Sequence, residues 1–233
     1  MSAIAVIPAR GGSRRIPRKN VIDLAGRPMI GHTIQAALES ECFSRVVVST
    51  DDAEIAAIAR EIGAEVPGLR PLSLADDQTP VSAATAYLLR ELAEDGATYD
   101  LVCQLMANCP LRTAADVRLS LDAFQASDAT AQISVTRFRF QSPWWAAQLD
   151  AGHHLEPLFS EAATARSQDL PALFCPTGAV WWARSGVLLE EETFHVDGRT
   201  GWEMSWINAL DIDEPDELEL ARVLMSARLS GEL

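Results

Sequence analysis

The 233-residue chain has few positive charges, few cysteines and no long apolar run. Its 19 Lys and Arg are outnumbered by 33 Asp and Glu, and the formal net charge of -14 argues against general nucleic-acid binding, which favours a broad basic surface. No apolar run approaches the roughly 20 residues that span a bilayer, and the N-terminus lacks the pattern of a signal peptide. The four scattered cysteines show no metal-type pairing. We therefore expect a cytoplasmic protein with reduced thiols, whose partners include neither nucleic acid nor membrane.

Positive charge is concentrated in one place. Five of the 19 cations lie between Arg10 and Lys19, directly after the apolar run 3–7, which is typical of a buried β-strand. Gly11 and Gly12 allow backbone N–H groups to approach a ligand, and the cations supply charge for phosphate oxygens. The loop has neither the ending of a Walker A motif nor the dinucleotide pattern Gly-x-Gly-x-x-Gly. It predicts a phosphate-binding loop of another type, and the alternative is a solvated turn with scattered cations.

Short β-like runs alternate with amphipathic helical stretches along the chain. The further expected strands cover residues 45–50, 101–105, 131–136 and 179–183, with a last one ending at 208–213. The expected helices cover 55–62 before Gly63, 81–95, a segment capped by Thr113 with Asp116, and a last one opened by Pro215. This alternation predicts one α/β domain over residues 1–233, with a mostly parallel Rossmann-like sheet and helices on both faces. Ligands of such sheets bind beyond the carboxyl ends of the strands.

One segment, residues 137–176, breaks this alternation. It carries the run Arg-Phe-Arg-Phe, then Pro143-Trp144-Trp145 and Pro157-Leu158-Phe159, without a clear helical period. We interpret it as an inserted β-rich arm. Its aromatic and arginine side chains either cover the end of the sheet or form a subunit interface, where Trp, Phe and Arg are enriched. The interface is the preferred interpretation.

A second candidate site is the pair Asp211 and Asp213. Residues two apart in a strand point to the same side, so these carboxylates could share a divalent cation such as Mg²⁺, which binds a few carboxylates together with phosphate oxygens. The alternative is ordinary capping of the following helix by one of the acids. The pair gains weight because a phosphate-type loop lies at the other end of the chain.

Five short motifs occur in the order found in CMP-sugar synthetases. They are the loop from Arg10 to Asn20, Ser49-Thr50-Asp51-Asp52, Leu69-Arg70-Pro71, Pro110-Leu111-Arg112-Thr113 and Asp211-Ile212-Asp213. Over essentially all 233 residues the chain resembles the acylneuraminate cytidylyltransferase family, and the combination is specific although each piece is short. Residues 14–20 and 166–171 are more similar to the pseudaminic acid branch. Residues 110–113 are more similar to the sialic and legionaminic acid branches.

The resemblance implies a nucleotidyltransferase fold, a homodimer, and a reaction in which CTP and a nine-carbon 2-keto acid sugar give the CMP-sugar and pyrophosphate. The anomeric hydroxyl of the sugar would attack the α-phosphorus. By position in the family motifs, Arg10, Ser13 and Lys19 would hold the triphosphate with Gly11 and Gly12, Asn20 would contact the nucleotide, Arg70 would help to recognise cytosine, and Asp211 and Asp213 would hold Mg²⁺. Of these residues, Arg10, Lys19 and Asp211 would be catalytic.

The expected sugar pocket departs from the sialic acid pattern. Met106 stands where that branch has Gln, and Cys175 stands where it has the Arg that would grip the sugar carboxylate, which a thiol cannot replace. Arg166 either takes that task or is only a surface or interface residue. Asn108 and Gln168 complete the expected sugar contacts. We therefore expect a nonulosonic acid other than N-acetylneuraminate.

Two other functions stay open from sequence alone. One is a nucleotidyltransferase that uses a sugar 1-phosphate and another NTP, although the neighbourhood of Arg70 favours cytosine. The other is a non-catalytic nucleotide-binding relative, which the intact basic loop and Asp pair disfavour. The expected partners are CTP, a small acidic sugar and a second copy of the chain.

Overall fold

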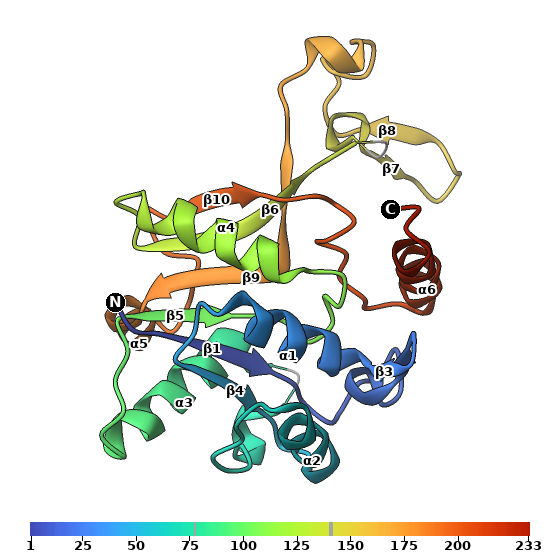
Figure 1. Cartoon of the computed structure of the whole chain (residues 1–233). Coiled ribbons are helices and arrows are strands. Elements are labelled where there is room, and N and C mark those ends of the chain that lie inside the picture. The colour runs from blue at the N-terminus through green and yellow to red at the C-terminus, as the bar shows by residue number, and fades with distance from the viewer. Residues whose placement is uncertain (77, 140–141) are drawn as a thin grey trace.

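The computed structural model describes residues 1–76, 78–139 and 142–233 (Figure 1). Its α-helices are α1 (Met29–Ser40), α2 (Ala53–Ile62), α3 (Val81–Glu94), α4 (Ala114–Gln125), α5 (Ser185–Glu191) and α6 (Pro215–Leu229). Its strands are β1 (Ala3–Pro8), β2 (Asp23–Leu24), β3 (Arg27–Pro28), β4 (Arg45–Ser49), β5 (Leu101–Gln104), β6 (Ala131–Arg137), β7 (Ala147–Leu149), β8 (Leu155–Pro157), β9 (Phe174–Arg184) and β10 (Thr200–Glu203). Short 3₁₀ turns are η1 (Lys19–Val21), η2 (Leu72–Leu74), η3 (Pro143–Trp145) and η4 (Ser167–Asp169). Within these described ranges, no helix is long and apolar enough to cross a membrane.

The main sheet has six strands in the order β10-β6-β9-β5-β1-β4. β1 pairs in parallel with β4 and β5, and β10 pairs in parallel with β6, whereas β9 is antiparallel to both β5 and β6. Five strands therefore share one direction, which confirms the mostly parallel sheet that the alternating pattern predicts. Because β1, β4 and β5 run the same way, their carboxyl ends at Pro8, Ser49 and Gln104 reach the same end of the sheet.

Alternate side chains of each strand enter two separate hydrophobic layers. Ala5 and Ile7 of β1 pack with α1, α2 and α4 on one face. Ile4 and Val6 pack with α3 and α5 on the other face. All four are fully buried, as is Trp182 of β9 on the first face. The helices therefore cover both faces, as the sequence predicts.

A third hydrophobic cluster joins segments from the two ends of the chain. It contains Ile16 of the basic loop, Leu111 after β5, Ile212 between the two aspartates, and Leu218 and Met225 of α6. Figure 1 shows α6 packed beyond the carboxyl end of β1, beside the β2–β3 hairpin. These apolar contacts bring the basic loop next to residues 211–213.

Most local signals in the sequence are confirmed, with one exception. Gly63 ends α2 in the left-handed region at φ 107°, and Thr113 and Asp116 form a capping box at α4. The strand expected at residues 208–213 is wrong, because the chain there forms a turn and then an irregular segment outside the sheet. The side chain of Ile212 is buried in the third cluster and its N–H donates to the carbonyl of Asn108 at 2.9 Å. The segment therefore crosses the ends of the strands instead of joining the sheet.

The long strand β9 contains a bulge that reaches the end of β5. At Ser134 of β6 the register with β9 shifts, and residues 177–180 are left out of the ladder. The buried hydroxyl of Ser134 accepts from the N–H of Val180 at 3.0 Å, so the displaced backbone keeps a partner. The carbonyl of Gly178 in turn accepts from the N–H of Met106 at 3.1 Å. The bulge therefore forms a wall beside the turn that follows β5.

The segment between β6 and β9 projects away from the sheet, as the arm in Figure 1. It contains less β-structure than expected, namely the short β7–β8 hairpin with the turns η3 and η4. Prolines 143, 157 and 171 supply no N–H groups to extend a ladder. Trp145 and Phe159 are 47% and 42% exposed. The role of this arm in dimerisation stays a prediction, and residues 140–141 lie outside the described part.

Candidate active site

An open cavity of about 530 Å³ lies beyond the carboxyl ends of β1 and β5, where the alternating pattern predicts a ligand. Its volume lies within the range of small-molecule sites. The basic loop, the start of α3, the turn after β5 and residues 211–213 form its walls. Ten residues that the sequence assigns to the site line this cavity: Arg10, Gly12, Ser13, Lys19, Asn20, Arg70, Met106, Asn108, Asp211 and Asp213.

Three residues that the sequence assigns to the site do not line this cavity. The N–H of Gly11 donates to Asp51 at 3.0 Å, and a Cβ at this position would lie 2.6 Å from an oxygen of Asp52. Close packing against the start of α2 therefore requires a glycine at position 11, and its contact with the nucleotide stays a prediction. Arg166 and Gln168 lie in the arm, where Arg166 pairs with Asp169 at 2.7 Å and Gln168 lines a separate hollow.

The protein itself supplies much of the negative charge around the basic loop. Arg15 contacts Asp213 at 2.8 Å and Glu214 at 2.9 Å. Arg18 contacts Asp52 at 2.9 Å and also pairs with Glu54 at the N-terminus of α2, while Arg10 donates to the carbonyl of Asp76 at 3.0 Å. The concentration of cations is thus explained in part by carboxylates from other segments. A bound triphosphate would have to compete with these acids for the loop.

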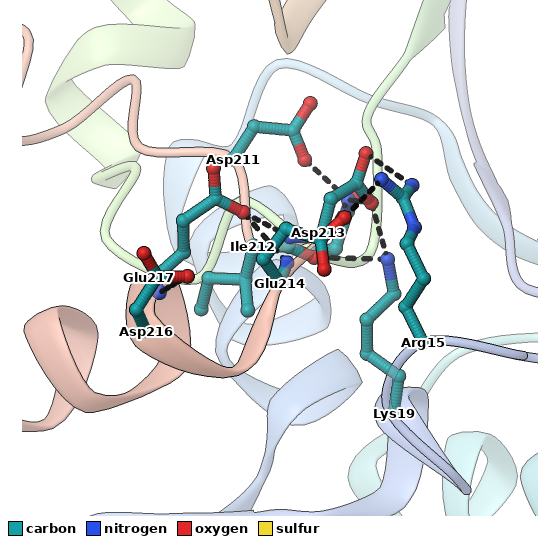
Figure 2. A network of polar contacts seen from close by, with 9 residues as sticks. Arg15, Lys19, Asp211, Ile212, Asp213, Glu214, Asp216 and Glu217 are labelled. Atoms are coloured by element: carbon teal, nitrogen blue, oxygen red, sulfur yellow. Dashed lines mark hydrogen bonds and ion pairs between the residues drawn. The ribbon is translucent and has the colours of Figure 1, made fainter.

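Lys19, the only lysine in the chain, links the basic loop to the aspartate segment. It begins the turn η1, directly after Arg18, whose backbone lies in the left-handed region at φ 58°. Its ammonium donates to Asp213 at 2.7 Å and to the carbonyl of Ile212 at 2.9 Å, and its side chain is only 14% exposed. Figure 2 shows Lys19 and Arg15 approaching Asp213 together. The positive and negative halves of the predicted site are therefore in direct contact.

The two aspartates converge although they do not lie in a strand. Ile212 is buried in the third cluster, and the aspartates on either side of it face the cavity. The side-chain nitrogen of Asn108 donates to Asp211 and, at 3.2 Å, to Asp213. The same-side arrangement that the sequence predicts is therefore present, but the third cluster and Asn108 produce it instead of a pleated strand.

The pKa values of the two carboxyls are shifted in opposite directions. Burial, with the charge of Asp213 beside it, raises the pKa of Asp211 to about 6. Burial alone would also raise the pKa of Asp213, but the hydrogen bond and charge of Lys19 and the charge of Arg15 lower it below its ordinary value. A buried carboxylate with an acidic neighbour is stabilised by a bound cation. Asp211 and Asp213 therefore fit a hard divalent ion such as Mg²⁺, which takes carboxylate oxygens together with phosphate oxygens.

Arg70 lies on the wall of the cavity with unsatisfied hydrogen-bonding capacity. Its side chain is 5% exposed, and burial lowers the pKa of its guanidinium. Its nearest carboxylate is Asp51 at 3.9 Å, and within the described residues its Nε has no hydrogen-bond partner. A buried donor without a partner is costly, so this position suits a ligand that supplies an acceptor.

Some residues around the cavity carry no signal in the sequence. Leu74, Asp76, Thr79, Val81 and Ala84, from η2 to the first turn of α3, line the wall near Arg70. The only sequence feature that indicates their position is the expected start of a helix at residue 81, close to the carboxyl ends of the strands. The contact of Arg15 with Asp213 also has no sequence signal, because charge pairing between distant segments leaves no local pattern.

We expect Asp211→Asn to stabilise the metal-free protein near pH 7.5. The carboxyl has a pKa of about 6 in the folded protein against an ordinary value of 3.8, so the folded protein binds this proton more tightly and loses stability as pH rises from about 4 to 6. At 1.36 kcal/mol per unit the gain from Asn is at most about 3 kcal/mol, and less because the group is partly solvated. Urea unfolding with EDTA at pH 7.5 and 4.5 measures it.

The gain should be largest at pH 7.5 and should shrink toward pH 4.5. Asp128→Asn, which removes one exposed acid elsewhere, is the matched control and should change stability little at either pH. A loss of stability in Asp211→Asn at pH 7.5 would contradict the destabilising effect of burial and of Asp213 on this carboxylate.

Comparison with known proteins agrees with this geometry. A family model described as Cytidylyltransferase matches residues 4–174. The chain is 32% identical over 224 residues to the pseudaminic acid cytidylyltransferase of Campylobacter jejuni subsp. jejuni strain 81-176, with 96% of each chain covered. It is also 32% identical over 227 residues to the CMP-N,N'-diacetyllegionaminic acid synthase of Legionella pneumophila, with 97% of each covered.

A solved structure shares the fold. The structure of CMP:2-keto-3-deoxy-manno-octonic acid synthetase complexed with CTP matches with a TM-score of 0.72 at 18% identity, covering 98% of this chain and 100% of that chain. At this identity the likeness concerns the fold alone. The family model and the two nearly full-length relatives carry the assignment, and the chain belongs to the cytidylyltransferase family.

Proposed function

We propose that this chain transfers CMP from CTP to a nonulosonic acid and releases pyrophosphate. The observation that carries the proposal is the contact of the basic loop with the aspartate segment, made by Lys19 and Asp213 in the wall of one cavity that Asp211 also lines. Such an arrangement places positive groups for a triphosphate beside carboxylates suited to a metal ion. The relatives named above, with an N-acylneuraminate cytidylyltransferase of Streptococcus agalactiae at 30% identity, indicate the substrate class.

Within the proposal, the nucleotide binds along the basic loop. Arg10, Ser13 and Lys19 hold the triphosphate, and the exposed Gly12 lets the backbone approach it. Asn20 and Arg70 contact the nucleotide, with the unpartnered Nε of Arg70 serving to recognise cytosine. The amide of Asn20 also donates to the carbonyl of Arg10 at 2.9 Å, and this hydrogen bond joins the two ends of the loop.

Asp211 and Asp213 would hold Mg²⁺ in this proposal. When bound, the ion would neutralise charge that develops on the phosphate oxygens during transfer. Asp213 already contacts two cations, so Lys19 and Arg15 must share it with the metal or move to the triphosphate. Lys19 has the reach to serve either group, because its flexible stem ends in three donors.

The sugar is proposed to be a nonulosonic acid other than N-acetylneuraminate. Met106 lines the cavity against the bulge of β9, where a Cβ on Gly178 would lie 2.7 Å from its Cγ. A thioether gives no strong hydrogen bond, and Cys175 at the start of β9 offers no cation for a carboxylate.

The protein is proposed to act in the cytoplasm. Its four cysteines are free thiols, which fits a reducing compartment.

A coupled pyrophosphate assay tests the function directly. With CTP and Mg²⁺, we expect turnover with at least one of pseudaminic, legionaminic or related acids, and little turnover with ATP, GTP or UTP. N-acetylneuraminate should be at least about tenfold poorer, because each missing charge-assisted hydrogen bond weakens binding by about 1.5–3 kcal/mol. A rate that is highest with N-acetylneuraminate would overturn the sugar assignment, and turnover of sugar 1-phosphates with another NTP would overturn the function.

The basic loop should be essential for turnover. Arg10→Ala and Lys19→Ala should each lower kcat/KM for CTP by about 10² or more, because they remove positioned charge from the phosphates. Arg118→Ala is the control, since Arg118 lies exposed on α4 and donates to the carbonyl of Glu39. Steady-state kinetics measure the effect, and equal small losses in all three variants would show that the loop is only a solvated turn.

Arg166 is proposed to act through a second copy of the chain. Its side chain is 72% exposed in the arm and does not line its own cavity, so a contact with the sugar requires a homodimer whose arms reach the neighbouring site. We expect a dimeric mass by light scattering at micromolar concentration, and a sugar KM raised about tenfold or more in Arg166→Ala. Arg199→Ala, at an exposed arginine outside the arm, should be silent. A fully active monomer with a silent Arg166→Ala would reject this.

A further inference from the structure

Asn108 is the one side chain in the described site that donates to both aspartates. It lies in the turn after β5 and is only 6% exposed. Its Nδ2 contacts Asp211, the carbonyl of Ile212 at 3.2 Å and Asp213 at 3.2 Å. Its own carbonyl accepts from the N–H of Ile212 at 2.9 Å. Backbone and side chain together therefore fasten the aspartate segment to the end of the sheet.

The orientation of this amide is fixed by its surroundings. The three groups that it faces are all oxygen acceptors: two carboxylates and a backbone carbonyl. An amide rotated by half a turn would place its own oxygen against these three oxygens, leaving no hydrogen bond and strong repulsion. The nitrogen must therefore point at the aspartates. This commitment conflicts with the sequence-based expectation that Asn108 grips the sugar with its amide donors.

The amide of Asn108 is a neutral donor, so it orients the two carboxylates without cancelling their charge as a cation would. Asp211 and Asp213 repel each other, and Lys19 offsets the charge of Asp213. Asn108 holds one oxygen of each carboxylate by hydrogen bonds without cancelling their negative charge. The pair therefore keeps its attraction for a positive ion, and the second oxygen of Asp211, beside Gly178, is left for it.

We propose that Asn108 is a positioning residue that holds Asp211 and Asp213 at the spacing a divalent cation requires. This inference rests on the proposed function, because it assumes that the aspartate pair binds the ion. The inference differs from the sequence-based expectation in the role of Asn108, which positions the two carboxylates and does not contact the sugar. It also explains why a buried, polar side chain is placed under two acids.

The test measures cation binding without turnover. Mn²⁺ is titrated into the protein in the presence of CTP, with no sugar, and the free ion is followed by electron paramagnetic resonance. We expect Asn108→Ala to weaken Mn²⁺ binding at least tenfold. In the assay with sugar, the Mg²⁺ concentration for half-maximal rate should rise by a similar factor, while the sugar KM stays within about twofold of wild type.

Asn208→Ala is the matched control. Its amide also donates to a carboxylate, Asp116 at 2.8 Å, but at the start of α4 and outside the cavity. It should lower stability without changing Mn²⁺ binding. If Asn108→Ala fails to fold by circular dichroism, Asn108→Ser, which keeps a short donor, should fold and show a smaller weakening of Mn²⁺ binding.

The outcomes separate this inference from the proposed function. If Asp211→Asn and Asp213→Asn leave Mn²⁺ binding intact, the metal assignment itself fails. If both lose Mn²⁺ but the variants at Asn108 bind it as wild type, only the role of Asn108 is overturned. A raised sugar KM with unchanged Mn²⁺ binding in Asn108→Ala would return Asn108 to the sugar.

Discussion

The contact of Lys19 with Ile212 and Asp213 is the interaction on which the site depends. It joins a loop at the start of the chain to a segment near its end, at 2.9 Å to the carbonyl of Ile212 and 2.7 Å to the carboxylate of Asp213. A concentrated group of cations is unfavourable in isolation, and here acids from two other segments, residues 52–54 and 213–214, offset it. The same cations are the ones a triphosphate would use. In the proposed function, binding of the nucleotide would therefore be an exchange of partners within an assembled site.

The aspartate pair shows how environment divides two identical side chains. Asp213 receives Lys19 and Arg15 and keeps a pKa below its ordinary value, whereas burial beside Asp213 raises that of Asp211 to about 6. The charge of Asp213 is already offset by two cations. The charge of Asp211 is buried beside a second carboxylate, and a bound cation would stabilise it. The fold tolerates this local cost because Ile212 and α6 fix the segment through the third hydrophobic cluster.

Much of the architecture could be predicted from the sequence because it follows from local patterns. A continuous apolar run specifies β1, which is buried along its whole length, and Gly63 and Thr113 mark helix ends by backbone and capping chemistry. The basic loop and the aspartates could be recognised as motifs. The strand expected at 208–213 failed because the same short pattern also suits an irregular segment whose hydrogen-bond partner, the carbonyl of Asn108, lies outside the sheet.

What the sequence could not indicate are contacts between segments far apart in the chain. Gly11 lies in a loop typical of ligand binding, but a side chain at this position would also collide with Asp52, which precedes α2. The amide of Asn108 serves two carboxylates that follow it by about a hundred positions, which no spacing rule predicts. The bulge of β9 depends on the hydroxyl of Ser134 in another strand. Such contacts become visible only when the tertiary structure is known.

Because Lys19 is the only lysine, the chain carries a single side-chain amine, and that amine lies in the cavity wall. Apart from the N-terminal amine, a reagent selective for amines has one target in this protein. A label there reports on the site without engineering, and a bound triphosphate would shield it. For the same reason, acylation that neutralises this one residue would remove the charge that joins the two ends of the chain. Arginines, which carry the rest of the positive charge, are untouched by that chemistry.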